Sequence, residues 1–164
     1  LERHGCQAAV GGMSWYALYY LDTHLDVWPV PVRLAGRALS RRLEHLQREM
    51  LEVLAEGGFP ALPPFQDLKA QVQGLVPAGC ALGAGWLLAA EMAGWILSGH
   101  KKVLCCQSFA CLPGHICARG KYAALQRRLP GSLIAGVDFD PSIGPGTVES
   151  RIRMLLDTPL PPAI

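Results

Sequence analysis

The chain has 164 residues, of which 51% are hydrophobic and 17% are charged, and its formal net charge is +2. This length is sufficient to bury a core, and the composition excludes an intrinsically disordered chain. So small a net charge also excludes a general electrostatic attraction to nucleic acid or to anionic membranes.

The start of the chain has neither an initiator methionine nor a signal-peptide pattern, and we expect a piece of a longer protein. Residues 74–99 have the length of a membrane span, but Pro77, several glycines and Glu91 interrupt them. We therefore expect a buried loop and helix there, and no membrane partner. The adjacent cysteines Cys105 and Cys106 fit a reducing compartment, so we expect a cytoplasmic protein.

Helical patterns dominate residues 1–64, which we treat as a helical segment. Apolar residues predict a helix over 14–26, and the WPVPV stretch ends it because proline restricts its own backbone and the preceding residue. Residues 33–56 form the clearest helix, with apolar residues at spacings of four and three and charged residues on the other side. The apolar set is Leu39, Leu43, Leu46, Met50 and Val53.

Residues 65–164 are interpreted as an α/β domain. After a short helix over 66–76, we expect a buried helix over 86–97 and then a strand in KKVLCC, residues 101–106. A helix over 116–129, with Ile116, Leu125 and Leu129 facing inward, leads to a second strand over 132–139 and a last helix over 147–156.

This order predicts a parallel, Rossmann-like βαβ unit with a right-handed crossover. Two strands alone do not make a sheet buried on both faces. We therefore expect further strands either in segments interpreted as helix or loop, or in a missing part of the protein.

Ligands of open parallel sheets bind at the carboxyl ends of the strands, so the loops after the two strands should lie side by side. Their candidate residues are Gln107, Ser108, Cys111, His115, Cys117, Asp138, Asp140 and Ser142.

Several interpretations of these loops are open. A zinc site would use Cys111, His115 and Cys117 with one preceding cysteine, although the spacing matches no standard zinc knuckle. A dithiol redox site lacks its Cys-x-x-Cys motif. The simplest interpretation makes Cys105, Cys106 and Cys117 packing residues and leaves Cys111 in the loop, where a thiolate can bind an iron–sulfur cluster.

Two carboxylate features have simpler explanations. The Asp138-x-Asp140 pair resembles a phosphatase nucleophile motif, but too few residues follow to supply the other motifs, so we expect both aspartates to cap the turn into the last helix. Glu91, on an apolar helix, is either a satisfied buried carboxylate or a group that supports the site.

Four stretches in order carry a family resemblance. They are GAGWLLAAEM (83–92), CCQSFACLPGHICARG (105–120), VDFDPS (137–142) and ESRIRMLL (149–156). Their order and spacing resemble the C-terminal part of proteins related to 2-hydroxyacyl-CoA dehydratases and their activases. The similarity covers residues 83–156 well, whereas residues 14–76 agree only in being helical.

The resemblance implies an iron–sulfur protein. In that family an ATP-driven activase delivers an electron to a [4Fe-4S] or double-cubane cluster, and the dehydratase then removes water from the acyl thioester. Cys111 stands at the matching Cys-Leu-Pro position and is the implied cluster ligand, with Gln107, Ser108, His115, Asp138 and Asp140 around it. The other ligands would come from remaining domains of the parent protein or from a paired dehydratase or activase subunit, so this chain alone should be inactive.

The sequence departs from the family pattern at several positions. Ala84 replaces Glu, Ser108 replaces Pro, Ala110 replaces Gly, Gly114 replaces Asn, residues 118–120 (Ala-Arg-Gly) replace Gly-Lys-Gly, and Ser150 replaces Asn. The loss of Glu and Asn removes two polar groups that could orient a cluster or substrate. The alternative function is a metal-free structural or interaction module of the same fold.

Overall fold

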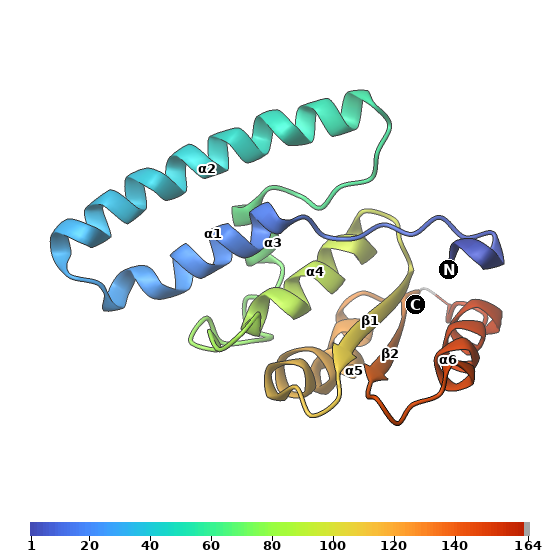
Figure 1. The fold of residues 1–164 in the computed structure, drawn as a ribbon. Coiled ribbons are helices and arrows are strands. Elements are labelled where there is room, and N and C mark those ends of the chain that lie inside the picture. Colours follow the sequence, from blue (N-terminus) through green and yellow to red (C-terminus); the bar gives the residue numbers. More distant parts are fainter. Residues whose placement is uncertain (163–164) are drawn as a thin grey trace.

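The computed structural model describes residues 1–162 and shows a helical N-terminal part beside a two-stranded parallel sheet (Figure 1). The predicted mixed α/β fold is confirmed. The division into segments 1–64 and 65–164 stays a prediction, and its last two residues lie outside the described part. One hydrophobic core joins residues of both segments, for example Tyr19 and Trp86, whose rings meet edge to face at a centroid distance of 5.1 Å.

Helix α1 spans Met13–His24, and a 3₁₀ turn over Leu25–Val27 connects it to helix α2, Val30–Glu56. Thus α2 begins three residues before its predicted start. Pro29 precedes the first turn and Pro31 lies within it, where proline is tolerated because backbone N–H groups have no partner in the helix. The prolines in WPVPV start this helix as well as separating it from α1.

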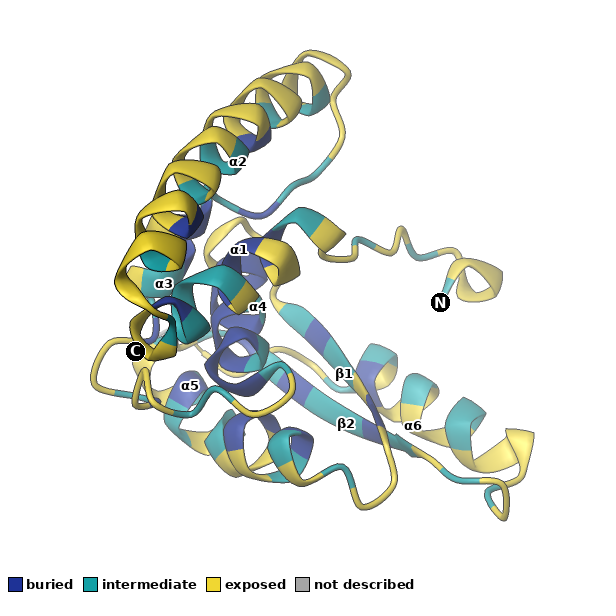
Figure 2. Ribbon diagram, turned by 60° about the vertical axis from the view of Figure 1, so that its left-hand side comes forward, coloured by how far each residue is buried: buried dark blue, intermediate teal, exposed yellow. Residues whose placement is uncertain are grey.

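Only part of the predicted apolar side of α2 faces the protein. Leu43 and Leu51 pack against the core, and the buried Gln47 accepts a hydrogen bond from the Phe65 backbone at 3.0 Å. Leu39 and Val53, which belong to the predicted apolar set, are exposed. Figure 2 shows the buried positions of α2 turned toward the body of the protein and its outer side exposed.

Helix α3 covers Phe65–Ala70, so the predicted helix over 66–76 is too long at its end, where turns replace it. Helix α4, Gly85–Leu97, is buried along most of its length, as predicted. No helix among residues 1–162 has the length and apolar character needed to cross a membrane.

Strands β1 (Lys102–Ser108) and β2 (Leu133–Phe139) are parallel, with Lys102 beside Leu133 and Ser108 beside Phe139. The predicted βαβ order is therefore present. No third strand occurs in the described residues, so the expectation that helix or loop segments hide further strands is wrong for residues 1–162.

The crossover is not the single helix predicted over 116–129. It consists of a π-helix (Gly114–Ala118), a 3₁₀ turn (Arg119–Lys121) and helix α5 (Tyr122–Arg128). Leu125 is buried as expected, but Ile116 is exposed, because the wider π turn changes the direction in which side chains point. Helix α6, Pro145–Asp157, lies across the sheet from α4 and α5 (Figure 1).

Candidate functional site

The loop after β1 places Cys111 at the carboxyl edge of the sheet. A tight turn follows the strand, in which the Cys111 backbone N–H donates to the Ser108 carbonyl at 3.1 Å and the Phe109 N–H donates to the Phe139 carbonyl at 2.9 Å. Cys111 is half-buried, and its own carbonyl accepts from the His115 N–H as the π-helix begins. The predicted ligand thus lies where the two strands end.

Ala110 adopts φ +59° in this turn and is the one non-glycine residue with positive φ among residues 1–162. The left-handed region costs an L-residue about 1 kcal/mol because its Cβ approaches the backbone.

We expect Ala110→Gly to leave the free energy of unfolding unchanged or to raise it by about 0.5 kcal/mol, because relief of the strained φ offsets the extra freedom of glycine in the unfolded chain. The matched change Ala38→Gly, at an exposed position within α2, should lower it by about 1 kcal/mol. Urea titration of both variants checks the contrast, and equal losses would refute the strained turn.

A hydrogen-bonded cluster spans the two strands beside this loop. Gln107 Nε2 donates to Asp138 Oδ1 at 2.5 Å and lies 3.4 Å from His115 Nδ1, while Arg119 Nη1 donates to Asp138 Oδ2 at 2.5 Å. The Gln107 hydrogen bond and then the Arg119 guanidinium hold the pKa of Asp138 below its usual range. Asp138 is therefore an ionised acceptor already paired by the protein.

Gly114 brings Gln107 and Cys111 together. A Cβ atom at Gly114 would lie 2.6 Å from Gln107 Oε1 and 3.4 Å from Cys111 Sγ. The Gln107 Oε1 atom is buried and has no hydrogen-bond partner within residues 1–162. A larger side chain such as asparagine at position 114 would therefore need the Gln107 amide to move.

The glycine turn before α4 supports the cysteine loop from a distant part of the sequence. A Cβ atom at Gly83 would lie 3.1 Å from Pro113 Cγ, so the turn and the Cys-Leu-Pro loop are neighbours. Gly83 has φ +59° and Gly85 has φ +36°, conformations that favour glycine. Two of the quoted motifs therefore meet in space.

The remaining predicted residues lie outside this cluster or use their side chains elsewhere. Asp140 Oδ1 accepts from the backbone N–H of Ser142 at 2.7 Å and from its hydroxyl at 2.5 Å, which makes a local turn. Ser108 is exposed at the strand end and contributes its backbone carbonyl. The expected capping role does not hold for Asp138, whose carboxylate binds Gln107 and Arg119 instead.

Of the three cysteines expected to pack, Cys105 and Cys117 do so, and the expectation is wrong for Cys106. Cys105 joins the core from β1, Cys106 is exposed on the same strand, and Cys117 is buried in the π-helix. Burial raises the pKa of the Cys117 thiol and keeps it protonated. Across residues 1–162 no three His, Cys, Asp or Glu side chains come together to hold a metal ion, so the zinc interpretation has no support in this part.

Glu91 faces a separate cavity of about 610 Å³. The N-terminal segment, α4, β1 and α6 enclose it, and most of its lining is apolar, including Met92, Trp95 and Leu155. Burial raises the pKa of Glu91 to about 7. Among residues 1–162, Glu91 is neither a hydrogen-bonded carboxylate nor part of the Asp138 cluster. Neither of the two roles expected for it from the sequence therefore describes this position.

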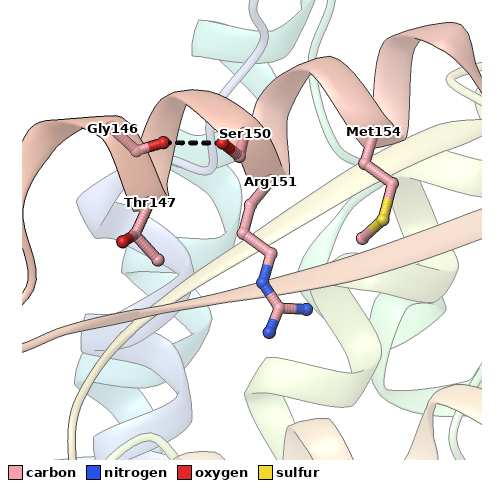
Figure 3. Close-up of a pocket in the computed structure, with 5 residues that line it drawn as sticks. All are labelled: Gly146, Thr147, Ser150, Arg151 and Met154. Atoms are coloured by element: carbon pink, nitrogen blue, oxygen red, sulfur yellow. Dashed lines mark hydrogen bonds between the residues drawn. The ribbon is translucent and has the colours of Figure 1, made fainter.

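A second hollow, of about 520 Å³, lies on α6 and is lined by residues of that helix alone (Figure 3). Ser150 lines it. Its hydroxyl donates to the Gly146 carbonyl at 2.8 Å within the helix. With no polar group from a second element directed into it, this hollow has no features of a binding site.

Arg119 and Gly114 are site residues that pattern alone does not single out. The parallel register places Gln107 beside Asp138, and Arg119, the first residue of the 3₁₀ turn that follows the π-helix, binds Asp138 from the crossover. Comparisons of the chain with protein-family models, with curated proteins and with solved structures find no match.

Proposed function

We propose that the chain contributes the Cys111 thiolate as one ligand of an iron–sulfur cluster in a protein related to 2-hydroxyacyl-CoA dehydratases and their activases. The observation that carries the proposal is the placement of a half-buried cysteine in a tight turn at the carboxyl edge of a parallel sheet. Its neighbours Gly114 and Pro113 hold that turn against Gln107 and the Gly83 turn.

The donor set fits one ligand of a cluster and not a complete site. In the described part of the chain, Cys111 is the thiol in the turn, and no group of three metal-binding side chains surrounds it. The remaining ligands would come from other domains of the parent protein or from a paired subunit. When bound, such a cluster supplies a low-potential electron for the dehydration of a 2-hydroxyacyl-CoA.

The chain's own residues hold the cysteine in place. Gln107 and Arg119 keep Asp138 ionised and paired, and because Arg119 directly follows the π-helix, this pairing ties the end of that helix to β2. Under this proposal, the βαβ unit is part of a larger Rossmann-like sheet. The other strands of that sheet would belong to the other domains of the parent protein or to the paired subunit. The parent protein would be a cytoplasmic lyase or its electron-transfer component, and this chain alone would be inactive.

We expect anaerobic incubation with iron, sulfide and excess 2-mercaptoethanol, followed by gel filtration to remove the unbound reagents, to give thiolate–iron charge-transfer absorption near roughly 400 nm in the protein fraction. The small thiol occupies iron positions that Cys111 does not reach. Cys111→Ala should lose most of this absorption. Cys106→Ala, which removes an exposed thiol from β1, should retain it.

Equal absorption in both variants, or none in the unchanged chain, would overturn the cluster proposal. It would favour the alternative, a metal-free structural or interaction module. That function is supported by large apolar side chains exposed on α2, such as Leu39, Met50 and Val53.

A further inference from the structure

The outer side of α2 carries a regular apolar stripe that faces solvent. Val32, Leu39, Leu46 and Val53 recur every seven residues and are 49%, 51%, 37% and 67% exposed. Met50, beside them, is also exposed. A seven-residue repeat keeps apolar side chains on one side of a helix over several turns, as in coiled coils. We call these five residues the outer stripe.

The protein uses the adjoining side of α2 for its own packing. Gly36 lies against Leu25 and Trp28, where a Cβ atom would come within 2.4 Å of Leu25 Cδ2. Farther along, Gln47 Nε2 donates to Ser14 Oγ at 3.2 Å. These contacts fix the rotation of α2 and leave the outer stripe exposed.

Charges divide α2 into two halves of opposite sign. Residues 30–43 contain four arginines and no acidic residue, whereas residues 44–56 contain four glutamates and one arginine. This order opposes the helix dipole, which favours acidic residues at the start and basic residues at the end. Within one chain the arrangement is therefore unfavourable, and an antiparallel second copy would compensate it.

We propose that two copies of this chain pair through the outer stripe, with their α2 helices antiparallel around a two-fold axis at Leu46. This axis sets Leu39 opposite Val53 of the second copy, because both lie seven residues from Leu46. It also brings Arg42, four residues before the axis, next to Glu49 of the second copy, three residues after it. Both side chains are exposed and lie between stripe residues.

A parallel pairing fits less well. It would place the four arginines of one copy along the four arginines of the other, and the glutamates likewise. The stripe spans about three heptads of a helix roughly 40 Å long, which suits a modest interface with a dissociation constant on the order of micromolar.

Sedimentation equilibrium of the purified chain tests the pairing. We expect a concentration-dependent monomer–dimer equilibrium, which Leu39→Glu abolishes by placing a charge in the stripe. The matched control Ala55→Glu adds the same charge to an exposed position of α2 outside the stripe and should leave the equilibrium within about twofold. A chain that stays monomeric at about 100 times the expected micromolar dissociation constant, or equal loss in both variants, would overturn the proposal.

A charge exchange tests the antiparallel orientation without relying on loss of function. Arg42→Glu alone and Glu49→Arg alone each place like charges across the two-fold axis, and each should weaken self-association about tenfold. Mixing the two variants should restore tight pairing as a heterodimer, in which every cross-axis contact is again between opposite charges. If the unchanged chain dimerises but the mixture shows no preference for the heterodimer, the antiparallel arrangement is wrong.

The pairing is independent of the cluster proposal. Cys111 lies in the loop after β1 and not on α2, so Cys111→Ala should dimerise with an unchanged dissociation constant, and loss of pairing in that variant would contradict the interface.

Discussion

Replacing Glu91 with glutamine is expected to raise the free energy of unfolding by about 2–3 kcal/mol at pH 8. Burial on α4 raises the pKa of this carboxyl to about 7 from the ordinary value of 4.5, so its charged form is disfavoured in the folded protein. A pKa difference of this size corresponds to a change of roughly 3 kcal/mol in the free energy of unfolding, and water in the adjoining cavity reduces that change somewhat.

The sign of the effect defines its pH range. Below about pH 4.5 the carboxyl is protonated in both the folded and the unfolded chain, and Glu91 does not oppose folding. As the pH rises from 4.5 through 7, the unfolded chain releases the proton more readily, so stability is lost progressively. Glutamine has the same shape without the charge and removes this loss.

Urea unfolding between pH 4 and pH 8 measures the difference between the variant and the unchanged chain. It should be near zero at pH 4 and greatest at pH 8. The control Glu52→Gln, on the exposed side of α2, should change stability by less than about 0.5 kcal/mol at pH 8. If Glu91→Gln and the unchanged chain showed the same dependence of stability on pH, the raised pKa of Glu91 would be contradicted.

Gly85→Ala should destabilise the protein by at least about 3 kcal/mol, a large part of the stability of a domain of this size. A Cβ atom at Gly85 would lie 1.8 Å from the Cys80 carbonyl oxygen and 2.4 Å from Tyr19 Oη. The carbonyl is held by a hydrogen bond from the Trp86 N–H, and Tyr19 is fully buried, so neither atom moves away easily. The positive φ of Gly85 adds strain for any other residue.

The matched control is Gly79→Ala in the same loop. No atom lies within 4 Å of a Cβ at Gly79, and its φ is outside the left-handed region, so the change should cost less than about 0.5 kcal/mol. Tryptophan fluorescence during urea unfolding compares the two variants. Similar urea midpoints for Gly85→Ala and Gly79→Ala would show that the space around Gly85 accommodates a methyl group.

Much of the sheet and its edge could be predicted because the local patterns were strong. The apolar runs of β1 and β2 are bounded by charged or turn residues, and a parallel arrangement then sets Gln107 beside Asp138. The same reasoning placed Cys105 and Cys106 in a strand and Cys111 in the loop. These features depend on residues close in sequence and on one rule of topology.

The details of the crossover could not be predicted. The sequence over 116–129 is compatible with a single helix, and its pattern does not indicate the π turn over Gly114–Ala118, where Gly114 lies close to Gln107 and Cys111. That turn exposes Ile116 and directs Arg119 toward Asp138. The helical spacing of apolar residues alone predicts neither the exposure of Ile116 nor the contact of Arg119 with Asp138.

The orientation of α2 also could not be predicted from the local sequence pattern. Its apolar residues form two adjoining rows, and only the packing of Gly36 and Gln47 decides which row faces the body. Four of the five residues of the outer stripe, all except Val32, belong to the predicted apolar side of this helix, and their exposure is the finding on which the pairing proposal depends.

Alkylation of the six cysteines, followed by mass spectrometry, tests the central proposal most directly because it reports which thiol binds iron. One sample would be treated with iodoacetamide as the unreconstituted chain, and a second sample after anaerobic reconstitution with iron, sulfide and 2-mercaptoethanol and removal of the unbound thiol by gel filtration. The cluster proposal predicts that Cys111 is modified rapidly beforehand and protected afterwards, while the exposed Cys106 is modified at the same rate in both samples. Equal modification of Cys111 in both samples would contradict its assignment as the cluster ligand.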